Sequence, residues 1–461
     1  MKRHQQSMLQ GPLFLNIVTY TIPIILTSLL QLLFNAADLV VVGRFCGSVS
    51  VAAVGATGAV TNLVINLFLG LSVGVAVCMS HALGSGDDEM AHRTVHTALP
   101  TALVSGVFLT IVGVAFSKTF LTWMGTPENV LPLSTLYMQV YFCGMTFNMV
   151  YNFCAAILRA AGDTKGPLIY LTIAGVINVI LNVIFVVFFN MNVAGVALAT
   201  AIAQGVSAVL VVLALMRRTD SCHLEWKQIR FYKAPLTKMV AKGLPAGIQG
   251  SMFSISNVII QSSVNSFGDI LMSAGAAAGN IEGFAYAIMN AFHQTALNFT
   301  GQNVGAGQYD RIKKIAIISL TSVAVVGAVV SIGMYLAAPQ LLSIYITDSP
   351  EAIVVGVRRM AFVTLPYFLL GVQDVMTGLL RGLGASLTPM LISVAGICGV
   401  RIIWIYTIFQ VPSFHTPDWL FVSYPISWVT ALIPQIILFT MLYKKQAAAH
   451  KRLTEGVAEW N

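Results

Sequence analysis

Ionisable residues that lie inside long apolar runs are the side chains of this sequence best suited to carry chemistry. They are Asp38, Glu282, Asp374 and Arg401, with His293 as a weaker fifth candidate. A charged side chain is costly in hydrocarbon, so such residues normally face a protein interior or a wet cavity. A carboxylate there can take up H⁺, because apolar surroundings favour its neutral form, or it can ligate Na⁺ as a hard cation. These residues therefore predict cation binding.

Polar side chains are spaced so that they can join Asp38. Gln31, Asn35 and Asp38 occur at i, i+4 and i+7, which places them on one face of a helix. Asn178 and Asn182 lie one helical turn apart in a later apolar run. The alternative is a polar cluster that only holds helices together. The predicted ion-coupling residues are Asp38, Asn35, Asn178, Asn182, Thr200, Glu282, Asp374 and Arg401.

Aromatic and methionine side chains could line a substrate cavity. Tyr137, Tyr141, Met145 and Met149 recur every four residues and form a stripe on one helix. Aromatic rings attract organic cations, and methionine adapts to varied shapes, although most such residues in this chain will be core or lipid-facing. The residues that we expect in the cavity are Gln31, Tyr137, Met145, Gln261 and Tyr286.

Other chemistries find little support in the sequence. Gly70-Leu71-Ser72-Val73-Gly74 matches a hydrolase pattern but lies within an apolar run, so close helix packing through its two glycines explains it better. His92 and His96 have no convincing third ligand, so no metal site is expected. The sequence has no Gly-Lys pair and hence no phosphate-binding loop of the Walker type, which argues against direct ATP drive. We therefore expect no enzyme and no cofactor other than a coupling ion, H⁺ or Na⁺.

Composition places these residues in a membrane. Of the 461 residues, 57% are hydrophobic and 9% are charged, against about 25% charged in an average soluble protein. So few charged residues cannot cover the surface of soluble domains of this total size. This excludes a soluble enzyme, a disordered chain and a nucleic-acid binder. Twelve spanning helices of about 20 residues each would use nearly all the apolar residues.

Apolar runs alternate with short polar breaks and predict an all-α integral membrane protein. The expected spans are roughly 13–40, 51–79, 94–117, 133–157, 167–189, 193–216, 239–265, 271–300, 315–337, 352–380, 389–409 and 418–443. Asn190-Met191-Asn192 alone divides the fifth span from the sixth, so a turn is required there. Most of the 25 basic residues fall in every second loop and at both ends. This predicts twelve spans in the cell inner (plasma) membrane with both termini in the cytoplasm.

The two halves of the chain repeat each other. Pro23 and Pro245 begin equivalent spans, and each is a candidate hinge. GSGDDEMAHR and GAGQYDRIKK begin at Gly84 and Gly305, while LRAAGDTKGP and LRGLGASLTP begin at Leu158 and Leu380. Six spans return the chain to the same side, so the copies are parallel repeats, typical of a transporter. The expected domains are residues 1–216, a cytoplasmic linker 217–238, and residues 239–461.

These motifs, in this order, resemble the multidrug and toxic compound extrusion (MATE) family along nearly the whole chain. The resemblance implies two six-helix lobes in a V around a central cavity. It also implies export of organic, often cationic, compounds driven by inward H⁺ or Na⁺. We expect the chain to act as a monomer in the lipid bilayer.

Three alternatives remain beside this function. A membrane-embedded enzyme, such as an acyl transferase, would need clustered His/Asp or Ser/His groups near an interface, and none stands out in the sequence. Lipid-linked headgroup and polysaccharide flippases share the wider superfamily, but they would need several basic residues to hold phosphates, and the sequence places only Arg401 deep in a span. A channel is disfavoured by the duplicated, proline-broken halves. The chain also departs from some prokaryotic members of the family, because Asn182 stands where they carry an acid.

Arg401 itself needs a partner inside the membrane. Counting about 1.5 Å per residue along each helix, we place Arg401 within about 5 Å of the depth of Glu282 and about 8 Å of the depth of Asp374. The sequence analysis therefore predicts a salt bridge from Arg401 to one of these two acids.

Overall fold

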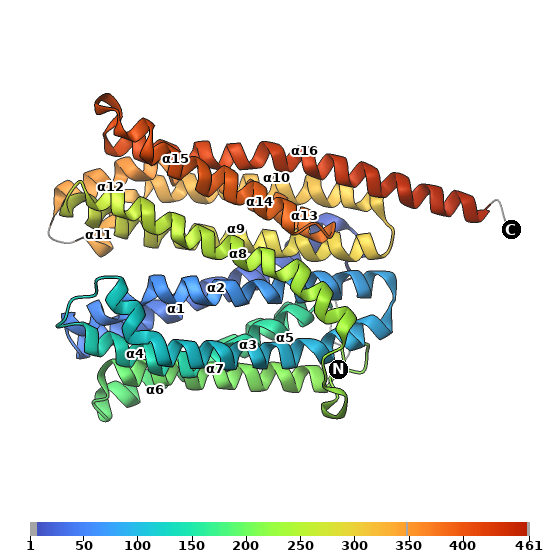
Figure 1. Ribbon diagram of the computed structural model, residues 1–461, viewed down its shortest axis with the longest axis horizontal. Coiled ribbons are helices and arrows are strands. Elements are labelled where there is room, and N and C mark those ends of the chain that lie inside the picture. Colours follow the sequence, from blue (N-terminus) through green and yellow to red (C-terminus); the bar gives the residue numbers. More distant parts are fainter. Residues whose placement is uncertain (1–6, 347–348, 459–461) are drawn as a thin grey trace. The chain divides into compact units, whose positions relative to one another are not determined.

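All the regular structure in the described residues is helical (Figure 1). The computed structural model describes residues 7–346 and 349–458. Two compact units divide the chain: the first contains residues 22–251, and the second contains residues 7–21 together with those from 252 onward. Helices α1 (Leu13–Phe45) and α8 (Lys233–Asn265) each run from one unit into the other. The unit boundaries thus fall inside these two helices, whereas the sequence placed the domain limits at 216 and 239.

The first unit is a bundle in which α3 and α7 make the central contacts. α3 packs against α2, α4 and α5, and α7 packs against α4, α5 and α6. A π-helical turn, Ile184–Phe188, extends α6. The helices are α2 (Ser48–Ser85), α3 (Asp88–Trp123), α4 (Leu131–Cys143), α5 (Met145–Ala160), α6 (Lys165–Val183) and α7 (Asn192–Met216).

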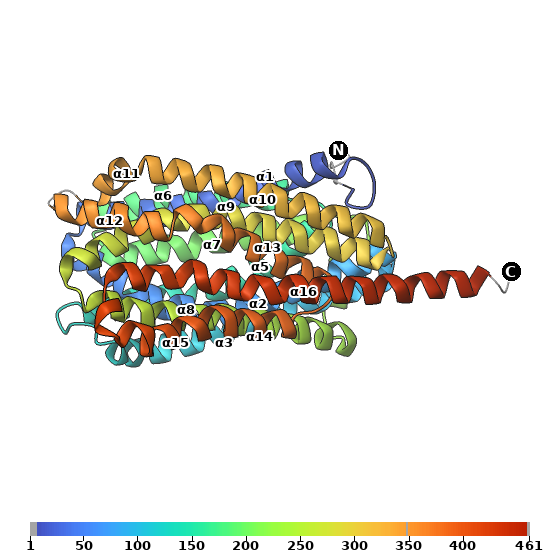
Figure 2. The ribbon, with the colours of Figure 1, turned by 90° about the horizontal axis from the view of Figure 1, so that it is seen from above.

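The second unit is centred on α9, which packs against α10, α12 and α13. A π-helical stretch, Val394–Gly399, joins α14 to α15, so these pieces together cover one predicted span. Figure 2 shows α16 in red, extending past the ends of α9 and α10. The helices are α9 (Asp269–Gly305), α10 (Tyr309–Leu336), α11 (Ala338–Tyr345), α12 (Pro350–Phe362), α13 (Phe368–Gly382), α14 (Leu387–Ser393), α15 (Val400–Tyr406) and α16 (Pro417–Ala458).

The length and apolarity of these helices are those of a multi-pass membrane protein. Nine helical segments among the described residues are long and apolar enough to span a bilayer, and α4 with α5, bent by 45°, makes a tenth. α8 and α9 coincide with the two remaining predicted spans but carry more polar side chains. The chain is therefore an all-α integral membrane protein, while the count of twelve spans stays a prediction.

The predicted repeat extends to the backbone conformation of the turns. Three pairs of glycines, each pair 221 or 222 residues apart, adopt left-handed conformations that a side chain would disfavour. They are Gly47 and Gly268 (φ 86° and 92°), Gly86 and Gly307 (69° and 68°), and Gly162 and Gly384 (86° and 87°). The turn expected between the fifth and sixth spans is also present, because Asn190 and Asn192 both have φ 53°.

Gly70 and Gly74 lie where two helices touch through their backbones. A Cβ at Gly70 would stand 2.0 Å from the Gly247 nitrogen, and one at Gly74 would stand 2.1 Å from the Met239 oxygen. The contact joins α2 to the part of α8 that belongs to the first unit. The interpretation of this G-x-S-x-G sequence as a helix-packing motif is confirmed.

The segment between α7 and α8 is folded against α3. His96 Nε2 accepts a hydrogen bond from the Glu225 backbone nitrogen (2.9 Å), and the Thr97 hydroxyl accepts one from the Tyr232 nitrogen (3.2 Å). His92 Nε2 bonds with the Gln228 side chain (2.8 Å). Both histidines therefore anchor this connection.

Candidate ion-coupling sites

Asp38 is the centre of a buried polar cluster in the first unit. It lies on α1 with 6% of its surface exposed. Asn182 Nδ2 on α6 donates to one carboxylate oxygen (2.5 Å), and the Thr200 hydroxyl on α7 donates to the other (3.0 Å). Asn178 Nδ2 donates to Thr200 Oγ1 (3.2 Å). Four predicted residues are thus brought together from three helices.

Neutral groups make all of these contacts with Asp38. No ion pair among the described residues involves this carboxylate. Asn182 Oδ1 is buried and has no hydrogen-bond partner in the described part of the chain. The cluster therefore combines an acid that lacks a countercharge with a spare oxygen acceptor. A proton on Asp38 or a small cation could use both.

Gln31 and Asn35 do not enter this cluster. Both are exposed on α1, while Asp38 on the same predicted face is buried. No hydrogen bond links either residue to Asp38 within residues 7–346 and 349–458. Sequence spacing placed the three on one side of a helix, but it could not tell where α6 and α7 cover that side.

The predicted aromatic and methionine stripe is interrupted at Gly144, where α4 meets α5. Tyr137 and Tyr141 stack with ring centroids 5.9 Å apart, and both lie within electrostatic range of Asp38. Met145 and Met149 are fully buried in the hydrophobic core of the unit. Met145 therefore does not line an open cavity in this structure, because the bend turns it into the core.

Glu282 pairs with an arginine that the sequence analysis did not single out. Arg359 Nη2 on α12 lies 3.1 Å from Glu282 Oε2, and Arg359 Nη1 donates to the Gly275 carbonyl (3.0 Å). The Thr364 hydroxyl donates to the other Glu282 oxygen (3.1 Å). Glu282 and Arg359 are both buried, at 7% and 8% exposure. The Arg359 guanidinium therefore compensates the negative charge of Glu282.

The predicted salt bridge of Arg401 is wrong. Arg401 Nε donates to the Ser427 hydroxyl (2.9 Å), and its guanidinium lies over the Tyr424 ring, 4.2 Å from the centroid. No described ion pair joins Arg401 to Glu282 or Asp374. Depth along a helix was the only coordinate available from the sequence. It carries no information on which way each side chain points or which helices are neighbours.

Asp374 on α13 contacts His293 on α9. His293 Nδ1 donates to the Asp374 carbonyl (2.7 Å) and lies 3.5 Å from its carboxylate. His293 Nε2 accepts from Arg381 Nη1 (3.3 Å), and Asn290 Nδ2 lies 3.4 Å from the second carboxylate oxygen. One donor and one acceptor on the ring describe a neutral histidine. The cluster therefore holds one carboxylate, one neutral imidazole and one guanidinium.

Gln261 and Tyr286, the remaining cavity candidates, are both exposed. Gln261 Nε2 donates to Asn265 Oδ1 on the same helix (2.9 Å). Tyr286, 40% exposed, lies within electrostatic range of Asp374. Both positions are therefore accessible in this structure.

Sequence reasoning missed Arg359 and a second polar network. Gln373, Thr377, Ser393 and Gln435 hydrogen-bond to one another across α13, α14 and α16 at 2.9–3.4 Å. None of these four side chains carries a charge, so a search for ionisable residues within apolar runs does not find them. The available signal was Gln373 and Thr377, two polar side chains one helical turn apart within a predicted span. Arg359 could have been found as a basic residue within the tenth predicted span.

Comparisons with known proteins place the chain in a family. The MatE family profile matches twice, over residues 23–184 and 245–407. The chain is 26% identical over 435 residues to the probable multidrug resistance protein YoeA of Bacillus subtilis, covering 93% of each. It is 21% identical to the multidrug export protein MepA of Staphylococcus saprophyticus, covering 81% of this chain and 83% of that one.

The fold is that of solved transporters. A solved outward-facing multidrug resistance transporter of the MATE family superposes with a TM-score of 0.87 at 20% identity, covering 97% of this chain and 99% of that one. The double profile match has the 222-residue offset of the repeat found in the sequence, since 245 exceeds 23 by that number. Because the family model matches both halves of the chain, the chain belongs to the MATE family of membrane transporters.

Proposed function

We propose that this chain exports organic, cationic compounds by alternating access, driven by inward movement of H⁺ or Na⁺ through the Asp38 cluster. The relatives named as multidrug resistance and export proteins support the direction and the class of substrate. The proposed transporter acts as a monomer, and its coupling ion is a co-substrate rather than a resident cofactor.

The observation that carries this proposal is the environment of Asp38. Neutral amide and hydroxyl groups hold the carboxylate, so its charge is balanced by no protein cation in the described residues. If the Asn182 amide turned over, its buried Oδ1 would face Asp38 and could accept a hydrogen bond from the protonated carboxyl group. The same oxygens, with Asn178 Oδ1 and Thr200 Oγ1, form an oxygen-rich set of the kind that Na⁺ favours.

Asp374 is a second acid that this proposal includes. Glu282 differs from it because Arg359 already compensates its charge. Arg401, with no acid partner among the described ion pairs, would act on ion binding only through its charge. We place coupling at Asp38 first and treat Asp374 as the alternative location in the second unit.

Transport by the purified chain in proteoliposomes tests the function. Ethidium serves as the organic cation, and a pH gradient or a Na⁺ gradient is imposed separately. We expect one gradient to drive ethidium transport and the matching ionophore to stop it. Ethidium movement that ignores both gradients would reject secondary transport.

A lipid-linked headgroup flippase remains the second candidate, because the structure buries more basic side chains than the sequence suggested. Arg359, Arg381 and Arg401 are 8%, 6% and 5% exposed. However, each contacts protein groups: Glu282, His293 and Ser427 respectively. A fluorescent undecaprenyl pyrophosphate analogue that crosses the same proteoliposomes, with ethidium left untransported, would favour the flippase.

A further inference from the structure

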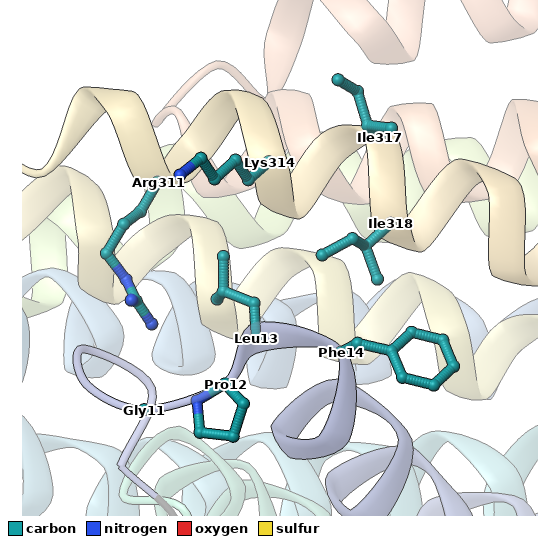
Figure 3. Close-up of a pocket in the computed structure, with 8 residues that line it drawn as sticks. All are labelled: Gly11, Pro12, Leu13, Phe14, Arg311, Lys314, Ile317 and Ile318. Atoms are coloured by element: carbon teal, nitrogen blue, oxygen red, sulfur yellow. The ribbon is translucent and has the colours of Figure 1, made fainter.

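A cavity of about 460 Å³ lies between the start of α1 and the first turns of α10, all within the second unit (Figure 3). Arg311, Lys314 and Ile318 line it from α10 at i, i+3 and i+7, so they share one helix face. Leu13 and Phe14 form the opposite wall. The cavity plays no part in the ion cluster around Asp38, which belongs to the first unit.

Hydrogen bonds fix the wall formed by the N-terminal segment. Gly11 adopts φ 81°, which lets the chain turn into α1. Asn16 Nδ2 donates to the Ser7 carbonyl (3.0 Å), and Asn303 Nδ2 on α9 donates to the carbonyl of buried Met8 (3.1 Å). This wall is therefore part of the folded unit.

One end of the cavity is positively charged. Figure 3 shows the amine of Lys314 and the side chain of Arg311 together at this end. Neither forms an ion pair with an acid in the described part of the chain. Arg311 Nη2 makes a long contact with the Met8 carbonyl (3.5 Å), while Arg311 Nε is buried without a partner among the described residues. Lys314 is exposed and Arg311 is partly exposed, so a ligand with acceptor oxygens could contact their outer nitrogens.

The rest of the cavity is apolar. Phe14 and Ile317 are 62% and 57% exposed, and Ile318 lies beside them farther along α10. α10 qualifies as a membrane span, so its first turn lies at the level of lipid headgroups while Ile317 and Ile318 lie deeper. Charge at the interface followed by an apolar surface matches the order of groups in a phospholipid.

We propose that this cavity binds an anionic phospholipid, with its phosphate at Arg311 and Lys314 and an acyl chain along Ile317 and Ile318. A soluble anion would leave the apolar surface uncovered. A zwitterionic lipid would compensate the two basic groups less well, because its headgroup carries a positive charge of its own.

Native mass spectrometry of the full chain in detergent tests this site. Dioleoyl phosphatidylglycerol is titrated against dioleoyl phosphatidylcholine, which has the same acyl chains. We expect Lys314→Gln to weaken phosphatidylglycerol binding about 5-fold, and the double variant Arg311→Gln/Lys314→Gln about 30-fold, since each basic residue contributes about one similar increment. Lys313→Gln is the matched control, because this exposed lysine occupies the same turn but does not line the cavity.

Two further arms complete the experiment. Ile318→Trp keeps the charge but fills the apolar part, so it should also weaken phosphatidylglycerol binding, and inorganic phosphate should not displace the lipid. Equal loss in Lys313→Gln, equal binding of the two lipids, displacement by inorganic phosphate, or no effect of Ile318→Trp would overturn the proposal. Should the double variant fail to fold, Lys314→Gln alone decides, because its side chain is exposed.

Discussion

Three buried acids differ in what surrounds them, and the proposed function therefore gives them different roles. Asp38 is held by Asn182 and Thr200, which are neutral. Glu282 is held by the Arg359 cation, and Asp374 lies against His293. An acid with a fixed countercharge resists protonation, since losing its charge would strand the partner. Asp38 is therefore the acid best placed to exchange an ion.

The Glu282–Arg359 pair should act as a structural unit. Glu282→Gln and Arg359→Gln each leave a buried group without its counterpart, so each should destabilise the fold by about 3–5 kcal/mol. The double variant should lose less than the sum, which thermal unfolding of the four proteins in detergent would measure. Arg358→Gln is the control, because Arg358 pairs with Asp418 at the exposed surface. Additive losses would show that the two side chains are not coupled.

How far the sequence predicts the site depends on the number of helices involved. Asn178 and Asn182 were recognisable because they repeat at one turn on a single helix, and Asp38 because it stands alone in an apolar run. Arg359 was not matched to Glu282, because that contact depends on how α12 lies against α9. Pairing between helices needs their rotation and neighbours, neither of which a one-dimensional depth count contains.

At the scale of the elements, glycines let the backbones of α2 and α8 touch each other. Gly74→Ala would place a Cβ 2.1 Å from the Met239 oxygen, so the helices must move apart. We expect a loss of about 1–3 kcal/mol in thermal stability. Gly58→Ala is the control on the same helix, because nothing lies within 4 Å of its Cβ position. A similar melting temperature for both variants would contradict the packing role.

α1 is the other element with a predicted moving part. It passes from the second unit into the first between Thr21 and Ile22, directly before Pro23. Proline lacks the backbone N–H that a continuous helix uses, which weakens the helix at this point. Pro23→Ala should slow ethidium transport in proteoliposomes more than it changes thermal stability. Equal transport rates for the variant and the parent would contradict the role of Pro23 as a hinge.

At the scale of the whole molecule, the repeat and the fold were predictable because they depend on patterns that recur along the chain. Turn motifs at a 221–222-residue offset became turns with matching backbone conformations. The division into units was less predictable, because α1 and α8 each belong to both. Apolar runs mark where helices begin and end but not which bundle each half of a helix joins.

The orientation in the membrane is open to a direct test. The distribution of basic residues predicts that both termini face the cytoplasm and that the loop containing Glu128 faces outward. In a background lacking Cys143, which is exposed, a membrane-impermeant maleimide added to intact cells should label Glu128→Cys but not Lys451→Cys. Labelling of Lys451→Cys without permeabilisation would reverse the predicted topology.

Gradient-driven transport by Asp38→Asn tests the central claim most directly. The amide nearly matches the carboxylate in shape but can neither carry a proton at neutral pH nor supply a charge to Na⁺. Ethidium transport is measured in proteoliposomes with the driving gradient imposed, beside ethidium binding at equilibrium and beside Asp310→Asn, an exposed acid at the start of α10. We predict that Asp38→Asn binds ethidium but loses gradient-driven transport, while Asp310→Asn keeps both. Full gradient-driven transport by Asp38→Asn would contradict the assignment of coupling to this residue.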